Sequence, residues 1–265
     1  MKMLYTSKSF TSDYPLEKAD VVFLGIPFDS TAYSEGNQRY GPTTIKKALK
    51  YRSSYQPDLD KNPLKEMKIH DAGEIDIVPG KFKETGKRIK ETIKEIKEVN
   101  KEAFLVLLGG EHTITLPIAE SIKPKTIVQL DAHKDLDEEL NSNKYTHNTW
   151  AKRIKESKPD INLVQIGTRQ CTEREKPEET EKIEEPVYLT VDIDIFDPSY
   201  APDVAYPEPL GKNPRQVDEI LDEVFQNKVI GMDICEVSSK EINNRTSYLA
   251  SWVILRSLSR LENEK

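Results

Sequence analysis

The sequence is poor in the features that mark membrane, secreted and disulfide-rich proteins. Its apolar runs, such as 103–108, are far shorter than the roughly 20 apolar residues needed to cross a bilayer. Residues 1–20 contain no apolar segment of the kind that a secretory signal needs. The two cysteines, Cys171 and Cys235, are well separated, so neither a disulfide framework nor a zinc finger is predicted. We therefore expect a cytoplasmic protein without a membrane partner.

The chain also lacks an excess of positive charge. Its 39 basic and 46 acidic residues give a formal net charge of −7. Because nucleic-acid-binding proteins usually present a basic surface, this balance argues against a nucleic-acid partner. At 265 residues the chain is long enough to bury a large core without a structural metal or a disulfide. No shift in composition divides it, so we expect a single domain over residues 1–265.

Short apolar runs alternate with amphipathic stretches along the chain. Six runs rich in Val, Ile and Leu predict buried strands at 20–25, 103–110, 125–130, 162–167, 186–194 and 228–237. Four stretches have helical spacing or a helix-starting proline and predict helices at 41–50, 83–101, 215–225 and 246–261. The charge run at 173–186 predicts a solvated loop or short helix. This alternation predicts an α/β fold with a parallel sheet and helices on both faces.

Acidic and histidine residues stand at the ends of three predicted strands. Six of them occupy these positions: His112, Asp131, His133, Asp135, Asp192 and Asp194. Alternate residues of an extended segment share one face, and functional groups of parallel sheets gather at the carboxyl ends of the strands. We therefore expect these side chains to face one cavity.

Four clustered carboxylates imply a nearby cation. Like charges at short range raise one another's pKa, so the carboxylates need compensating positive charge, which two divalent ions would supply. Oxygen and imidazole ligands without thiolate suit Mn²⁺, and Fe, Co, Ni or Zn are also compatible. Taken alone, an Asp-x-Asp pair at a strand end is usually a cap, and a His after Gly-Gly is usually structural. The three patterns together predict a binuclear metal site.

Three segments resemble the signature blocks of the ureohydrolases, the family of arginases and agmatinases. They are GGEHTIT, DAHKD and VDIDIFDPSYAP, at 109–115, 131–135 and 191–202. Shorter matches in the family's order lie at 25–29, 36–48, 70–76, 165–169 and 232–237, so the resemblance covers nearly the whole chain. It implies a single-domain, three-layer, arginase-like α/β fold around a parallel, about eight-stranded sheet.

The resemblance also implies a role for each matching residue. The ligands of two Mn²⁺ ions per subunit would be His112, Asp131, His133, Asp135, Asp192 and Asp194, with Asp131 and Asp192 bridging the ions. His147 matches the family's proton-shuttle histidine, and Glu236 matches the glutamate that holds the substrate guanidinium. Asp135 would also orient the nucleophile. Family members form trimers or hexamers, so a homo-oligomer is expected. His70 matches no functional position, and we expect it to be structural.

Two departures from the family bear on the substrate. The third block usually continues APGTGTPEPGG, whereas this chain reads APDVAYPEPLG, which predicts a bulkier loop around Tyr206. After DAHKD, where arginases bind an α-carboxylate, this chain has Asp137, Glu138 and Glu139. Three acids would repel a carboxylate and attract a terminal ammonium. Agmatine, hydrolysed to putrescine and urea as in polyamine biosynthesis, is therefore the expected substrate.

The sequence leaves several alternatives open. The nearest are other guanidino-compound hydrolases: an arginase, a guanidinobutyrase or a guanidine hydrolase. A metal-dependent deacetylase shares the fold, but its usual single-zinc site lacks the full set of six ligands. A catalytically weak paralogue that serves as an oligomeric partner is favoured by the altered DVAY loop and opposed by the intact ligand set.

Overall fold

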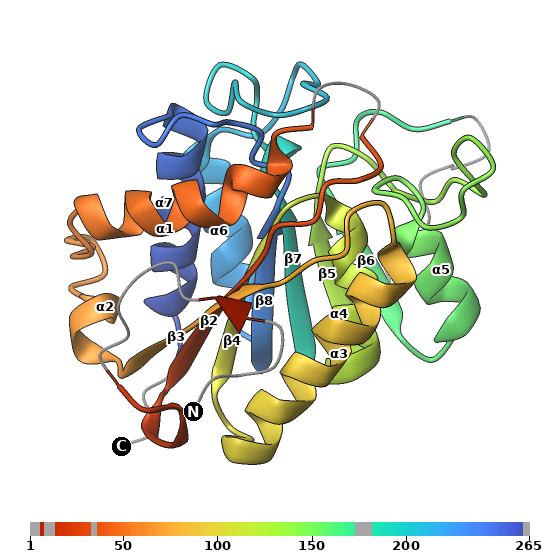
Figure 1. Cartoon of the computed structure of the whole chain (residues 1–265). Helices are drawn as coiled ribbons and strands as arrows, with labels where there is room; N and C mark the ends of the chain where they lie inside the picture. Colours follow the sequence, from red (N-terminus) through yellow and green to blue (C-terminus); the bar gives the residue numbers. More distant parts are fainter. Residues whose placement is uncertain (1–5, 8–13, 33–35, 173–181, 262–265) are drawn as a thin grey trace.

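The computed structural model describes residues 6–7, 14–32, 36–172 and 182–261. It contains one sheet of eight strands in the order β1-β3-β2-β4-β8-β7-β5-β6 (Figure 1). The strands are β1 (Thr6–Ser7), β2 (Val21–Ile26), β3 (Ile69–Ile75), β4 (Phe104–Gly109), β5 (Thr126–Leu130), β6 (Asn162–Ile166), β7 (Val187–Asp192) and β8 (Val229–Cys235). Strands β2 to β8 are parallel, and β1 pairs antiparallel with β3 at the edge. The predicted parallel sheet of about eight strands is confirmed.

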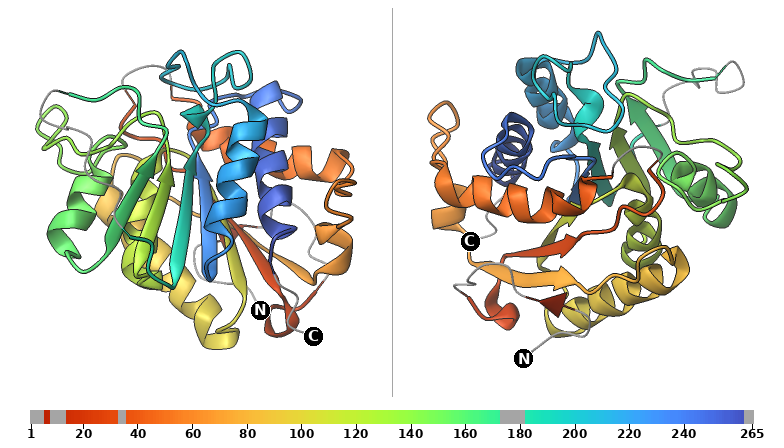
Figure 2. Two further views of the ribbon diagram at one scale, coloured as in Figure 1. Left: turned by 180° about the vertical axis from the view of Figure 1, so that it is seen from behind. Right: turned by 45° about the horizontal axis from the view of Figure 1, so that its top comes forward.

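Helices cover both faces of this sheet. They are α1 (Gly41–Tyr51), α2 (Pro63–Glu66), α3 (Phe82–Val99), α4 (Thr115–Ile122), α5 (Trp150–Ser157), α6 (Pro214–Val224) and α7 (Arg245–Leu258), with short 3-10 helices η1 (Leu16–Lys18), η2 (Gln38–Tyr40), η3 (His112–Ile114) and η4 (Ile193–Ile195). α1 and α6 pack against α7, whereas α4 packs against both α3 and α5. Figures 1 and 2 show α3 and α4 on one face, and α6 and α7 on the other. The three-layer prediction is therefore confirmed.

The apolar strands are buried because both of their faces meet helices. In β2, Val21 and Phe23 belong to the core cluster that contains α7 side chains. The residues between and after them, Val22 and Leu24, belong to the cluster that contains α3 side chains. Since side chains alternate between faces along a strand, a strand between two helical layers reads as a continuous apolar run. The buried sheet thus supports the residues that lie at the ends of its strands.

The predicted elements lie where the sequence placed them. All six predicted strands and all four predicted helices begin and end within three residues of their predicted bounds. Strands β1 and β3 and helices α2, α4 and α5 were not among the predicted elements. Most of the charge run at 173–186 lies outside the described residues. Within the described ranges, no helix has the length and apolar character needed to span a membrane.

Candidate metal and active site

The candidate site lies at the carboxyl ends of four neighbouring strands. β4, β8, β7 and β5 are adjacent in the sheet, in that order. His112 follows β4, Glu236 follows β8, Asp192 is the last residue of β7, and Asp131 follows β5. Because neighbouring parallel strands end at the same edge of a sheet, residues far apart in the chain meet there.

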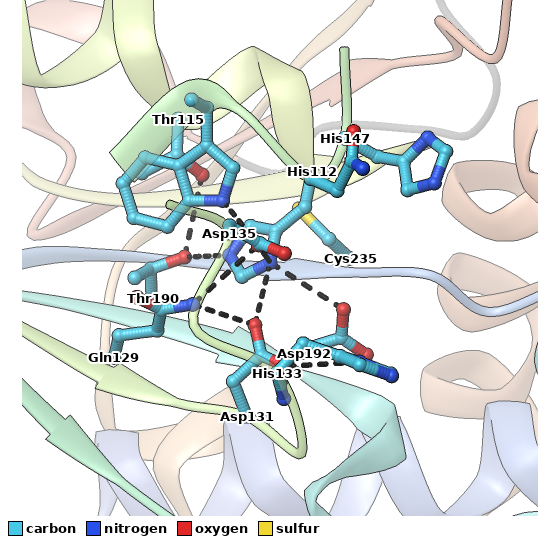
Figure 3. Close-up of polar contacts among 12 residues, drawn as sticks. His112, Thr115, Gln129, Asp131, His133, Asp135, His147, Thr190, Asp192 and Cys235 are labelled. Atoms are coloured by element: carbon cyan, nitrogen blue, oxygen red, sulfur yellow. Dashed lines mark hydrogen bonds and ion pairs between the residues drawn. The ribbon is translucent and has the colours of Figure 1, made fainter. Parts of the chain in front are cut away.

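His112 faces three carboxylates. Its Nδ1 atom lies 3.1 Å from an oxygen of Asp131, 3.3 Å from one of Asp135 and 3.4 Å from one of Asp192. Figure 3 shows the three carboxylates gathered around this ring. His112, Asp131 and Asp192 form a group whose potential ligand atoms all lie within 4.8 Å of one another.

A second group shares Asp131 with the first. It consists of Asp131, His133 and Asp194, again within 4.8 Å of one another. The Nδ1 atom of His133 lies 2.9 Å from Asp194 Oδ2 and 3.5 Å from Asp131 Oδ1. The structure therefore brings together all six residues that the sequence singled out. Five of them form two groups joined by the carboxylate of Asp131, and the sixth, Asp135, lies beside His112.

The donor atoms of these groups fit divalent cations. The Nδ1 atom of His112 is buried and has no hydrogen-bond partner among the described residues. Burial opposes the charged imidazole, yet the carboxylates around it raise the pKa of His112 well above its usual value. For His133 burial is likewise outweighed, by Asp131 and Asp194, and its pKa rises to about 12. The carboxylates thus favour positive charge at this point. The carboxylate oxygens and the imidazole nitrogens of the two groups are donors that suit transition-metal ions.

The local backbone differs from the extended segments expected after the strands. Asp135 has φ 55°, in the left-handed region, so a turn and not an extended chain directs it toward His112. Asp194 lies in η4, and its N–H donates to Asp192 Oδ1 at 2.9 Å. The expected convergence of the side chains is correct, but alternation along an extended segment was the wrong reason for these two residues.

Two of the candidate ligands, on the β5 side, accept hydrogen bonds from donors that the sequence analysis missed. Gln129 Nε2 donates to Asp131 Oδ2 at 2.7 Å, and Trp150 Nε1 donates to Asp135 Oδ2 at 2.6 Å. Both donors are buried. An amide inside the apolar run TIVQL was the available signal for Gln129, whereas nothing local marks Trp150. These donors fix the orientation of the carboxylates.

Behind His112 lies a buried polar network. His112 Nε2 is 2.7 Å from Thr190 Oγ1, and Thr190 donates to Asp233 Oδ1 at 2.6 Å. Tyr188 donates to the other oxygen of Asp233 at 2.8 Å. His112, Asp233 and Cys235 form a third group of potential ligands. Because hydroxyl donors occupy both oxygens of Asp233, the network supports the His112 ring and does not itself suit a metal.

His147 borders the same cavity, which has a volume of about 260 Å³. Its Nδ1 atom lies 3.1 Å from Thr31 Oγ1, and its ring stacks on Tyr206 with centroids 5.3 Å apart and planes 14° apart. Burial, followed by the positive charges of His133 and His112, lowers the pKa of His147 to about 4. A neutral imidazole with one ring face covered is therefore present beside the cluster of carboxylates.

Glu236 borders the cavity from the β8 side. Its carboxylate accepts the backbone N–H of His112 at 2.7 Å and the side-chain amide of Gln38 at 3.1 Å. Its own φ is 67°, again in the left-handed region. Burial, reinforced by the negative charge of Glu111, raises the pKa of Glu236 to about 8. Gln38, which the sequence analysis did not single out, thus helps to hold this carboxylate.

The three acids after DAHKD do not act as a group. Asp137 lines the cavity and accepts a hydrogen bond from Asn148 Nδ2 at 2.6 Å. Glu138 is 71% exposed and pairs with Lys152 at 2.8 Å, and Glu139 is exposed. Of the three acids expected to attract the ammonium of the substrate, only Asp137 lines the described cavity, and Glu138 and Glu139 do not.

Two other expectations concern residues around the site. Val204, Ala205 and Tyr206 all line the cavity, so the unusual DVAY loop does contribute to its wall. His70 lies in β3, where its Nδ1 atom is 2.8 Å from the carbonyl oxygen of Tyr14. It does not line the cavity, which agrees with a structural role.

Comparisons with known proteins agree with this geometry. The sequence model of the Arginase family matches residues 19–184 and 178–259. The chain is 35% identical to the N(1)-aminopropylagmatine ureohydrolase of Thermococcus kodakarensis, over 97% of each chain. It is 34% identical to the agmatinase of Pyrococcus horikoshii, over 94% of this chain and 95% of that one. The solved structure of proclavaminate amidino hydrolase from Streptomyces clavuligerus has the same fold, with a TM-score of 0.81, 24% identity and coverage of 98% and 97%. The chain belongs to the arginase family and is a hydrolase of amidino carbon–nitrogen bonds.

Proposed function

We propose that the chain hydrolyses agmatine to putrescine and urea, with two Mn²⁺ ions per subunit. The observation that carries this proposal is the pair of ligand groups joined by Asp131. One carboxylate shared between two imidazole-containing groups is the arrangement expected of a binuclear site. His112, Asp131, Asp135 and Asp192 would hold one ion, and Asp131, His133, Asp192 and Asp194 the other.

When bound, a pair of divalent cations lowers the pKa of water and so supplies a nucleophile near neutral pH. The protein's own residues would do the rest. Glu236 pairs with the guanidinium of the substrate and orients its carbon. A guanidinium beside Glu236 would also favour the ionised carboxylate, against the burial that raises its pKa to about 8. Asp135 accepts a hydrogen bond from the attacking water.

His147 would complete the reaction by moving a proton. Attack of water on the guanidinium carbon forms a carbon–oxygen bond, and the bond from that carbon to the substituted nitrogen then breaks. The leaving amine needs a proton, which His147 delivers as a general acid. The neutral imidazole beside the cavity can accept this proton from the attacking water and then donate it.

Charges on the cavity wall support a substrate with a cationic tail. Apart from the proposed ligands and Glu236, the charged residues lining the cavity in the described structure are Asp137, Glu208 and Lys134. Two acids and one base leave a net negative charge. This balance favours the terminal ammonium of agmatine over the carboxylate of arginine or guanidinobutyrate.

A second candidate is N(1)-aminopropylagmatine. The Thermococcus kodakarensis relative bears this substrate in its name, and its identity to this chain is as high as that of the agmatinase. The tail of N(1)-aminopropylagmatine is longer than that of agmatine and carries an additional amine, which the negatively charged cavity wall would attract. The two candidates differ only in the length and charge of the tail.

A urea-release assay with Mn²⁺ present tests the proposal. The substrates are agmatine, N(1)-aminopropylagmatine, arginine, guanidinobutyrate and guanidine. We expect the highest kcat/KM for agmatine and a much lower value for both carboxylates. Preference for N(1)-aminopropylagmatine would select the second candidate, and preference for a carboxylate or for guanidine would overturn both.

A further inference from the structure

Glu111 is a buried carboxylate for which the proposed chemistry has no use. It directly precedes His112, is completely inaccessible to solvent, and belongs to neither metal-ligand group that contains Asp131. Three donors converge on it. The N–H of Thr31 donates to Oε2 at 2.8 Å, the hydroxyl of Thr31 donates to Oε1 at 2.9 Å, and the hydroxyl of Thr113 donates to Oε1 at 2.5 Å.

The Thr31 hydroxyl also contacts His147 twice. Thr31 Oγ1 accepts the backbone N–H of His147 at 3.2 Å and lies 3.1 Å from the ring atom Nδ1. A hydroxyl has one hydrogen and two lone pairs. Because the hydrogen of Thr31 is directed to Glu111, both contacts with His147 must use its lone pairs. The Nδ1 atom of His147 must therefore carry a hydrogen and act as the donor.

We infer that Glu111 and Thr31 are positioning residues that fix the tautomer of His147. The Glu111–Thr31–His147 chain keeps the hydrogen on Nδ1 and leaves Nε2 as the ring nitrogen that exchanges protons. This inference rests on the proposed role of His147 as proton carrier. It adds that the carboxylate next to a metal ligand serves the proton carrier and not a metal.

Tyr206 and Thr31 restrain different properties of the ring. The stack with Tyr206, with planes 14° apart, defines the plane of the imidazole. A half-turn of the ring about its Cβ–Cγ bond would preserve that stack while placing Cδ2, and not Nδ1, opposite Thr31. Among the contacts of His147 in the described structure, the hydrogen bond to Thr31 is the one that depends on the position of Nδ1 and on its hydrogen. The tautomer should therefore depend on the Thr31 hydroxyl much more than on Tyr206.

The direct test is nitrogen NMR of the histidine side chains in protein loaded with diamagnetic Zn²⁺. The chain has four histidines, and His147→Ala assigns the signals of His147. We expect Nδ1–H for His147 in the wild type and in Thr31→Ser, which keeps the hydroxyl. Thr31→Val, which has the same shape without the hydroxyl, should give a mixture of tautomers. Nε2–H in the wild type would overturn the inference whatever the activity.

Kinetics provide the second readout. Thr31→Val should lower kcat by about 10-fold with little change in KM, within the roughly 10²-fold loss expected for His147→Ala. Thr31→Ser should restore most of the rate, which a purely structural role for the methyl group would not explain. The control Thr113→Val removes a donor from the same carboxylate without touching His147. It should keep the Nδ1–H tautomer and reduce kcat far less.

The outcomes separate the inference from the proposed function. If His147→Ala slows the reaction but Thr31→Val and Glu111→Gln do not, the positioning role is wrong while the proton carrier stands. If His147→Ala leaves kcat unchanged, the proposed role of His147 fails, and the NMR result still decides the tautomer.

Discussion

At the scale of single residues, Asp131 has the most connected position in the site. It belongs to both ligand groups, whereas Asp194 belongs to one. Asp131→Asn should therefore reduce the metal content from about two ions per chain to none, because each group loses a charged oxygen. Asp194→Asn should lose one ion only. Elemental analysis after Mn²⁺ loading measures both, and Asp222→Asn on the surface of α6 serves as the control. Equal losses in the Asp131 and Asp194 variants would contradict the shared carboxylate.

Asp137 should contribute to substrate selection without contributing to chemistry. Asp137→Asn should raise KM for agmatine by about two- to fivefold, as expected for a partly exposed charge, and leave kcat unchanged. The increase should become smaller as salt is added. Glu138→Gln is the matched control, because its carboxylate pairs with Lys152 and not with the cavity. An equal effect of both substitutions would mean that the general negative field selects the cation, and not Asp137.

The sequence predicted the candidate ligands better than it predicted their supports. Charged residues directly after apolar strands can be recognised in the sequence as candidate site residues, because the carboxyl ends of the strands of a parallel sheet lie close together. Gln129 and Thr190 lie inside the strands, where a single polar residue is usually read as a tolerated exception. Trp150 reaches Asp135 only through the fold, since 15 residues separate them in the chain. Hydrogen-bond partners of this kind depend on tertiary placement and not on local pattern.

At the scale of elements, the ends of β2, β4 and β8 are tied together at Gly110. Its N–H donates to the carbonyl of Ile26 at 2.9 Å, and its carbonyl accepts the N–H of Glu236 at 2.9 Å. A Cβ atom at Gly110 would lie 2.1 Å from the carbonyl oxygen of Phe28, so the backbone would have to move. This close approach explains why a glycine stands immediately before the Glu111-His112 pair.

Gly110→Ala should therefore destabilise the protein and disturb the site. The expected loss is about 1–3 kcal/mol in the free energy of unfolding, as for other overpacked positions, with weaker metal binding. The control is Gly86→Ala in the interior of α3, where a Cβ would meet Pro117 at an ordinary 3.6 Å. That substitution should stabilise the protein by about 0.5–1 kcal/mol, because glycine is unfavourable inside helices. Denaturant unfolding measures both changes, and a stabilising Gly110→Ala would contradict the assigned role.

The elements missed by the sequence analysis have recognisable reasons. Strand β3 reads IHDAGEI, with polar residues that no buried parallel strand is expected to contain. The structure accommodates Asp71 through a buried ion pair with Lys46 of α1 at 2.6 Å. Helix α4 contains Pro117, which is tolerated only because it lies in the first turn. A partner from another element therefore explains β3, whereas the position of the proline within the helix explains α4.

At the scale of the whole molecule, the single domain over residues 1–265 and a homotrimer or homohexamer remain predictions. Size-exclusion chromatography with light scattering would measure the oligomeric state.

The buried carboxyl groups at the carboxyl ends of the strands have a consequence for the stability of the whole chain. Without metal, burial raises the pKa of Asp135 to about 7 and that of Glu236 to about 8. In the unfolded chain both carboxyl groups have ordinary pKa values of about 4.

These shifts determine how the metal-free protein responds to pH. An acid whose pKa is raised by folding stabilises the folded state below its unfolded pKa and loses that contribution as pH rises through the folded pKa. The raised pKa values of His112 and His133 act in the same direction, because the unfolded imidazoles release their protons near pH 6.5 while the folded ones retain them. Asp131, whose pKa is lowered, opposes them only in the acid range, below its unfolded pKa. The lowered pKa of His147 also opposes them, but only up to about pH 6.5, where the unfolded imidazole loses its proton. Between about pH 5 and about pH 8, the metal-free fold should therefore lose stability.

Bound cations should reverse this loss, because they replace the protons that the ligands retain in the metal-free fold. We expect the rise in Tm on adding Mn²⁺ to be larger at about pH 8 than at about pH 5.5, where protons compete with the metal. Thermal unfolding with Mn²⁺ or with a chelator, at both pH values, measures the difference. Asp131→Asn, which should bind no metal, serves as the control and should show no Mn²⁺-dependent rise at either pH. A metal-free Tm that increases toward pH 8 would mean that the buried carboxyls do not retain their protons, and that the charge balance inferred for the site is wrong.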